Sequence, residues 1–183
     1  WMQIVRAKIR HQAANLAEHD PARLKLAALA EAVRSGDREN VEAQASRVYW
    51  ERFFPNDEFR RRREGDAPNN FLNYGYAVLR AAVARALVGA GLHPALGIHH
   101  RSRYNPYALA DDLMEPFRPM IDARARVLWR RDRVEIDRDV KTGLLAVLTD
   151  TVKFSDSQGP LVVALGRMTA SFVRCLGKEE RKL

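Results

Sequence analysis

Residues 97–119 read GIHHRSRYNPYALADDLMEPFRP. Two adjacent histidines end one segment, a turn-rich linker follows, and a short helical segment then carries Asp111, Asp112 and Glu115. In a helix, Glu115 lies four residues after Asp111 and three after Asp112, so it can share a face with either aspartate. Imidazole and carboxylate ligands together suit manganese, iron or zinc, and a carboxylate-rich set also suits magnesium. The stretch therefore predicts a loop histidine that faces carboxylates on a helix and binds a divalent cation.

Length and composition predict one globular domain. The chain has 183 residues, of which 46% are apolar and 30% are charged, enough for one hydrophobic core. No apolar run approaches the length of a membrane span, and Trp1-Met2-Gln3 does not begin a signal peptide. We therefore expect an intracellular protein with no membrane partner. The single cysteine, Cys175, excludes an intramolecular disulfide and a cysteine-based metal site.

The charge of the chain favours a nucleic-acid partner. Lysine and arginine total 31 against 23 acidic residues, which gives a net charge of +8 and a pI near 10.0. Basic surfaces bind phosphate backbones, because each neutralised phosphate releases a condensed counterion. Most of the basic residues are arginines, whose planar fork matches phosphate oxygens. Many basic proteins bind nothing specific, so charge alone leaves DNA binding and a merely soluble surface equally open.

Apolar residues recur at helical spacing along most of the chain, and no persistent alternation of period two occurs. This pattern predicts an all-α domain of about seven helices. We expect these helices at the N-terminus, from Asp20-Pro21 to Gly36, at about 38–54, at 69–90, from the Asp111 segment through 129, at about 139–154, and from Pro160 onward. Asp37 is expected to cap the third helix, Asn69 and Asn70 the fourth, and Pro116 and Pro119 to bend the fifth.

Two helices have a predicted buried stripe. In the third helix the inner stripe is Val41, Ala45 and Val48, and Tyr49 and Phe53 lie with Glu42 on an adjoining face. Glu42 is therefore expected beside the buried face and not opposite to it. The last helix has a stripe that is predicted to be core along its whole length: Leu161, Leu165, Met168, Phe172 and Leu176.

Four consecutive arginines, Arg60 to Arg63, interrupt the helical pattern. They cannot all face a core, so they predict a solvated loop or a helix end. Contact of Arg61 and Arg62 with a DNA backbone is one interpretation, and a merely soluble surface is the other.

The segment LADDLMEPFRP, preceded by AGLHPALGIHH and NNFLNYGYAVL, resembles the helical catalytic domain of the CRISPR-associated integrase, the Cas-one family. It is most similar to the branch found in type II CRISPR systems. The resemblance runs from WMQIVRAKIRHQ to the last helix, and its motifs are long, gap-free and ordered as in the family. It implies that residues 1–183 are this helical catalytic domain. Family members carry a smaller β-rich domain upstream, and the helical pattern here has already begun at Trp1, so we expect that domain to be absent from this chain.

The resemblance also implies a set of catalytic residues that bind the cation. These are Glu42 in NVEAQASRVYW, His100 in GIHH and Glu115 in DLMEPFRP. They come from three separate segments, and the sequence alone does not show that they meet. His99 is the alternative to His100, and Asp112 is a further ligand, bound directly or through water.

Three arginines flank these ligands: Arg101, Arg103 and Arg118. One interpretation is that they neutralise the acidic cluster within the fold, since neighbouring carboxylates need compensation. The other is that they bind DNA and hold the phosphodiester under attack.

The chemistry implied by the resemblance is phosphoryl transfer assisted by Mn²⁺ or Mg²⁺. The 3′-hydroxyl of a captured DNA fragment would attack a phosphodiester of the CRISPR array, and water in its place would give nuclease activity. The implied partners are double-stranded and branched DNA, a second copy of the chain, and a small ferredoxin-like subunit. The alternatives are a non-catalytic helical DNA-binding module, a helical scaffold, and a folded but truncated form that cannot assemble.

Overall fold

The computed structural model describes residues 1–54, 59–154, 157–180 and 183. Eight α-helices occur in these parts of the chain, and the all-α prediction is confirmed apart from one short hairpin. The helices are α1 (Met2–Ala14), α2 (Pro21–Ala32), α3 (Val41–Phe53), α4 (Asn69–Gly89), α5 (Ala108–Met114), α6 (Arg118–Trp129), α7 (Arg138–Leu145) and α8 (Leu161–Leu176). The remaining elements are the 3₁₀ turns η1 (Ser35–Asp37), η2 (Glu115–Phe117) and η3 (Ala146–Thr149) and the strands β1 (Thr151–Phe154) and β2 (Ser157–Pro160).

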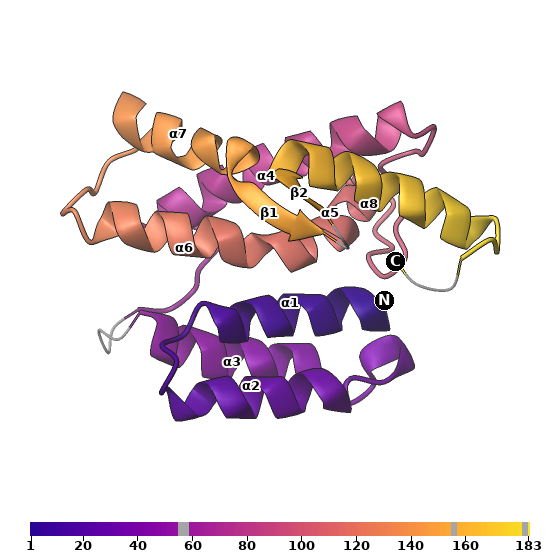
Figure 1. Ribbon diagram of the computed structural model, residues 1–183. Coiled ribbons are helices and arrows are strands. Elements are labelled where there is room, and N and C mark those ends of the chain that lie inside the picture. The colour runs from indigo at the N-terminus through magenta and orange to yellow at the C-terminus, as the bar shows by residue number, and fades with distance from the viewer. Residues whose placement is uncertain (55–58, 155–156, 181–182) are drawn as a thin grey trace.

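The helices form two groups that pack on each other (Figure 1). Helices α1, α2 and α3 lie side by side in one group, and α4 packs with α5, α6, α7 and α8 in the other. Helix α1 joins the groups, because it contacts α2 and α3 on one side and η2 and α6 on the other. One continuous apolar core runs through both groups. No helix in the described parts combines the length and the apolar content that crossing a bilayer requires.

Helix α3 begins three residues later than the sequence predicts, and Asp37 fixes its start from outside the helix. The carboxylate oxygens Oδ1 and Oδ2 of Asp37 accept hydrogen bonds from the backbone N–H groups of Val41 and Glu42, at 2.9 and 3.0 Å. Asp37 therefore caps the helix as predicted. It does so from outside the helix, because Asn40, which has a left-handed conformation (φ 53°), lies between Asp37 and the first helical residue. As a result Glu42 lies in the first turn of α3, at a defined position.

The predicted inner stripe of α3 is wrong by one residue. Tyr49 and Phe53 are fully buried, whereas Val48 is only half-buried. The buried face follows a spacing of four, through Val41, Ala45, Tyr49 and Phe53. The Tyr49 hydroxyl donates a hydrogen bond to Asp122 of α6 at 3.1 Å, and this contact turns the aromatic face toward the core.

The helix predicted at 139–154 ends at Leu145, and the hairpin of β1 and β2 follows η3. Asp150 leaves the helical conformation (φ −59°, ψ 138°), and Arg124 of α6 binds its carboxylate at 2.5 and 2.7 Å. The antiparallel strands then pair Thr151 with Pro160. At the end of α8 the stripe also departs from the prediction, because Leu176 is 59% exposed.

Helices α4 and α6 approach closely at Gly75. A Cβ atom at this position would overlap Cγ2 of Ile121, which is completely buried. Glycine is therefore required at position 75 because Ile121 of α6 leaves no room for a side chain. The backbone conformation of Gly75 is helical and does not itself require glycine.

We expect Gly75→Ala to be less stable than Gly89→Ala by about 2 kcal/mol in the free energy of unfolding, because overpacking a core costs about 1–3 kcal/mol. Gly89 is the matched control, since it lies in the same helix and a Cβ there would meet nothing within 4 Å. At that position alanine should be neutral or stabilising by up to about 1 kcal/mol. Urea denaturation of both variants measures the difference, and equal stabilities would contradict the close approach.

Candidate metal centre

The ammonium group of Lys8 connects two of the predicted ligands. Lys8 Nζ, on α1, lies 2.6 Å from Oε1 of Glu42 on α3 and 2.6 Å from Oε2 of Glu115 in η2. Lys8 is 9% exposed and Glu115 is 4% exposed, so most of this cluster is shielded from solvent. The structure therefore brings Glu42 and Glu115 to one cation, although they lie far apart in the sequence.

Glu115 carries a second ionic contact, from its Oε1 to Nε of Arg118 at 3.0 Å. Neither Glu115 Oε2 nor Arg118 Nε has an aligned hydrogen-bond partner among the described residues, although both atoms are buried. Both atoms instead lie in ion pairs, Oε2 with Lys8 Nζ and Nε with Glu115 Oε1. Lys8 also donates a hydrogen bond to Glu42.

The charges in this cluster keep each other ionised. Burial raises the pKa of Glu115, but the positive charges of Lys8 and Arg118, with a smaller effect from His100, outweigh it and hold the pKa below its ordinary value. Burial also lowers the pKa of Lys8, but the charges of Glu115 and Glu42 outweigh that effect and raise it. Glu115 and Lys8 are therefore both charged at neutral pH.

His100 is positioned by Asp112. His100 Nδ1 donates to Asp112 Oδ1 at 2.5 Å, and Asp112 Oδ2 accepts the backbone N–H groups of Ile98 and His99 at 2.6 and 2.8 Å. A side chain at Gly97 would overlap the carbonyl oxygen of His100, so the loop closes on Asp112 only with glycine there. Histidines that bind metals commonly donate their other ring N–H to a carboxylate in this way. The arrangement presents His100 Nε2 as the available ring nitrogen.

The predicted ligand set is assembled only in part. His100 is near enough for its charge to affect the pKa of Glu115, and its side chain is 44% exposed. In the described ranges, however, no three histidine, cysteine, aspartate or glutamate side chains lie close enough together to hold a metal ion. Two ionised carboxylates that share one cation, beside an oriented imidazole, are the donor types that suit Mn²⁺ or Mg²⁺. The ligand set therefore remains a prediction, and the residue types at the site are consistent with it.

The two alternatives for the ligands have other contacts. The His99 ring stacks on the indole of Trp1, with ring centroids 4.1 Å apart. Asp112 is fully buried and its oxygens already receive the hydrogen bonds of the loop. These contacts favour His100 as the histidine of the site and Asp112 as the residue that positions it.

Two of the predicted arginines lie at the site. The guanidinium groups of Arg118 and Arg61 lie 4.8 and 5.3 Å from the ring centroid of Tyr76. Both arginines line a cavity of about 170 Å³ next to Lys8. Arg61 reaches it because its guanidinium donates to Asn69 and Asn73 at the start of α4. Asn69 thus holds the arginine loop and is not the N-cap, which is Pro68.

The other three predicted arginines lie on the surface. Arg62, Arg101 and Arg103 are exposed. The guanidinium of Arg103 pairs with the neighbouring Tyr104 hydroxyl at 2.6 Å, and so it does not neutralise the acidic cluster. Their predicted contact with DNA stays a prediction.

Two charged residues next to the small cavity, Lys8 and Asp122, were not predicted from the sequence. Lys8 shares a helix with the buried Val5 and Ile9, so a lysine beside an apolar stripe was the available signal. Asp122 is completely buried in α6 and accepts hydrogen bonds from the hydroxyls of Tyr49 and Tyr76. Burial raises the pKa of Asp122 to about 7, although these two hydrogen bonds oppose the shift.

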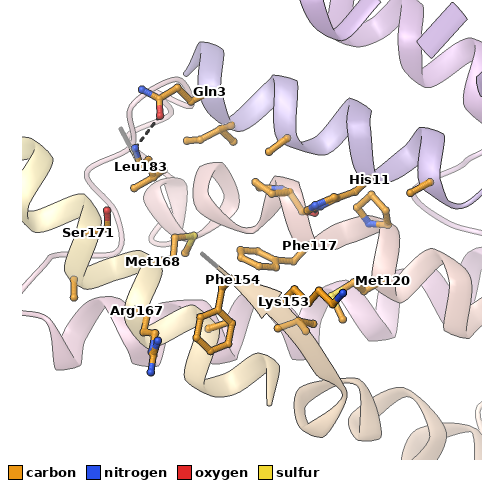
Figure 2. A pocket seen from close by; sticks show the side chains of 18 of the residues that line it. Gln3, His11, Phe117, Met120, Lys153, Phe154, Arg167, Met168, Ser171 and Leu183 are labelled. Atoms are coloured by element: carbon orange, nitrogen blue, oxygen red, sulfur yellow. Dashed lines mark hydrogen bonds between the residues drawn. The ribbon is translucent and has the colours of Figure 1, made fainter. Parts of the chain in front are cut away.

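A hollow larger than this cavity lies elsewhere in the described structure. It has a volume of about 1070 Å³ and separates α1 and η2 from β1 and α8. Figure 2 shows Phe117, Phe154 and Met168 directed into it, with Lys153 and Arg167 at its edges. None of Glu42, His100 and Glu115 lines it. The predicted ligands therefore do not face this groove.

Comparison with known proteins gives a family. The family described as "CRISPR associated protein Cas1" matches residues 2–153. A CRISPR-associated endonuclease Cas1 of Neisseria meningitidis serogroup C (strain 8013) is 42% identical over 176 residues, which cover 94% of this chain and 57% of that protein. The chain thus spans little more than half the length of this relative.

Two solved structures share the fold. A casposase bound to its integration product aligns with a TM-score of 0.81 and 20% identity, over 100% of this chain and 64% of that one. A chain of a Cas6-RT-Cas1–Cas2 complex aligns with a TM-score of 0.79 and 21% identity, over 98% of this chain and 24% of that one. At this identity the two structures show the fold alone.

The raised pKa of Asp122 predicts a pH dependence of stability. Because the folded-state pKa is about 7 against an ordinary value of 3.8, the folded protein keeps a proton that the unfolded chain has released. The free energy of unfolding should therefore fall as the pH rises from about 4 to about 7, by up to about 1.4 kcal/mol per pH unit. Asp122→Asn should flatten this slope in urea denaturation between pH 5 and pH 7.

The control for this experiment is Glu31→Gln. Glu31 is exposed, and the hydrogen bond and charge of Arg10 lower its pKa, so it stays ionised in both states over this range. Glu31→Gln should keep the slope of the unmodified protein. If Asp122→Asn keeps it as well, Asp122 is not the buried carboxyl responsible.

Proposed function

Because the chain belongs to the CRISPR-associated Cas1 family, we propose that it is the catalytic part of a metal-dependent DNA endonuclease and integrase of CRISPR adaptation. The observation that carries this proposal is the convergence of Glu42 and Glu115 on one ammonium group. It is supported by the His100 ring, which Asp112 of α5 orients through Nδ1. Two carboxylates that already share one cation are donors of the type that bind the cation of a metal-dependent phosphoryl transferase.

In this proposal Glu42, Glu115 and His100 hold Mn²⁺ or Mg²⁺, and Asp112 orients the His100 ring through Nδ1. A bound cation of this kind lowers the pKa of an attacking hydroxyl and offsets the charge that develops on the phosphate. The protein supplies the positions of the groups: α3 and η2 fix the two carboxylates, and the loop anchored on Asp112 fixes the imidazole.

Arg118 and Arg61 are the proposed phosphate-binding groups. Both guanidinium groups lie near the Tyr76 ring at the wall of the small cavity, which restricts their orientation before DNA binds. Arginine forms bidentate hydrogen bonds with phosphate oxygens, so these two residues can hold a phosphodiester beside the carboxylates.

The proposed reaction is a transesterification. The 3′-hydroxyl oxygen of a captured DNA fragment forms a bond to a phosphorus of the CRISPR array, and the bond from that phosphorus to the original 3′-oxygen breaks. The hydroxyl proton is lost to solvent, and the leaving oxygen gains one. Water in place of the DNA hydroxyl gives endonuclease activity by the same path.

We propose double-stranded and branched DNA as the substrate, with a second copy of the chain and a small ferredoxin-like subunit as partners in the whole protein. The net charge of +8 supports the DNA partner. The solved relatives of similar fold include a casposase bound to an integration product and a complex that contains Cas1 and Cas2.

We predict that Glu42→Ala, His100→Ala and Glu115→Gln each lower strand transfer into branched DNA by at least about 100-fold, because the cation contributes several kcal/mol to the transition state. DNA affinity should change little, since the arginines remain. The matched control is Glu31→Gln, a carboxylate change at an exposed ion pair with Arg10. A strand-transfer assay with and without chelator, and after Mn²⁺ is added back, measures the effect.

The alternatives give different results in the same assay. Full activity of any one variant refutes that residue as a ligand, and full activity after chelation refutes metal dependence. Salt-sensitive DNA binding with no activity under any metal condition indicates a non-catalytic module. Metal-dependent cleavage without strand transfer indicates a folded form that does not assemble.

A further inference from the structure

The cation that Glu42 and Glu115 share is a side chain of the protein. Lys8 Nζ lies 2.6 Å from an oxygen of each carboxylate, where the proposed function requires a divalent ion. We propose that Lys8 is a built-in competitor for that ion, which holds the two carboxylates together in the metal-free protein and must leave before they bind metal. This inference rests on the proposed function and adds to it the residue that controls metal loading.

The ammonium group and the metal cannot occupy the site together. Mg²⁺ binds carboxylate oxygens at about 2.0–2.1 Å, so an ion bound to Glu42 Oε1 and Glu115 Oε2 would lie in the space now filled by Lys8 Nζ. Like charges at such a short distance also repel strongly where solvent is excluded. Metal binding by both carboxylates therefore requires the Lys8 side chain to move.

The structure provides a place for the displaced group. Lys8 and Gln12 both line the cavity of about 170 Å³, and a spacing of four residues places them on one face of α1. Gln12 is 2% exposed, and its Oε1 is buried without a hydrogen-bond partner among the described residues. This oxygen is an acceptor for a displaced ammonium. The volume suffices, since one water takes about 30 Å³ in the liquid.

The charges around the cavity explain why Lys8 lies between the carboxylates in the metal-free protein. The guanidinium groups of Arg61 and Arg118 line the same cavity and repel an ammonium there, whereas Asp122 alone among its lining residues can supply a negative charge. Glu42 and Glu115 attract the ammonium on the other side. When a competing state predominates, the apparent affinity for a ligand falls in proportion to the fraction of competent molecules.

Calorimetric titration of metal-free protein with Mn²⁺ tests the inference. We expect Lys8→Met to bind Mn²⁺ at least about tenfold more tightly than the unmodified protein, as removal of a competitor that occupies nine sites in ten predicts. Arg118→Met is the matched control, because it removes a positive charge 3.0 Å from Glu115 that does not lie between the two carboxylates. Its removal also takes a positive charge away from Glu115, but it does not vacate the position of the ion, so it should tighten binding by less than Lys8→Met does. Affinity of Lys8→Met that is no higher than that of Arg118→Met overturns the inference.

A second measurement uses the unmodified protein and decides the question if Lys8→Met does not fold. The side-chain NH₃⁺ signal of Lys8 is followed by ¹H–¹⁵N NMR during titration with Mg²⁺, and it is assigned by its loss in Lys8→Arg. We expect this signal to shift as Mg²⁺ binds, because the ammonium leaves Glu42. A signal that stays unchanged at saturating Mg²⁺ contradicts the inference.

Failure of the proposed function and failure of the inference about Lys8 give different results. If the unmodified protein binds no Mn²⁺ and shows no metal-dependent strand transfer, the proposed function fails, and the inference fails with it. If strand transfer depends on metal but Lys8 neither shifts nor competes, the proposed function stands and Lys8 is only a structural charge.

Discussion

The ammonium of Lys8 is shared between Glu42 and Glu115, and this contact ties α1 to α3 and to η2. Charges shielded from water are tolerated only when they are paired, and removal of one partner of a buried pair commonly costs about 3–5 kcal/mol. The two groups of helices therefore meet at a point where three charges compensate one another. The remaining features of the site are arranged around this point: Arg118 on Glu115, the small cavity beside Lys8, and the histidine loop at the edge.

The groups of the site differ in how firmly they are held. Both carboxylates lie on regular elements, and the start of α3 is fixed further by the two hydrogen bonds of Asp37. His100 lies on a loop. The buried Asp112 of α5 holds that loop, because its carboxylate contacts the His100 ring and the backbone N–H groups of Ile98 and His99. The carboxylates are thus preset, and the imidazole is oriented while its side chain keeps access to solvent. Such an arrangement suits the binding of an ion and a DNA strand that we propose.

The helical class was predicted from the sequence and is confirmed. Glu42, His100 and Glu115 stay a prediction as ligands, and only the resemblance grouped them, because no local pattern links three separate segments. The sequence could not predict Lys8, since a single lysine beside an apolar stripe becomes informative only when α3 and η2 are placed against α1. The hairpin was missed because two four-residue strands are too short to show alternation against the helical pattern around them. Tyr49 was predicted on the face next to the core instead of in it. Its hydrogen bond to Asp122 is a tertiary contact, which the helical pattern of α3 does not reveal.

The central claim is that Glu42 and Glu115 form a cation site that a lysine fills when metal is absent. Anomalous X-ray diffraction from a crystal of the protein soaked in Mn²⁺ tests it most directly. The account predicts a manganese peak between these two carboxylates and next to the His100 ring, with the Lys8 ammonium moved toward Gln12. Manganese bound elsewhere, with Lys8 Nζ still between Glu42 and Glu115, would contradict it.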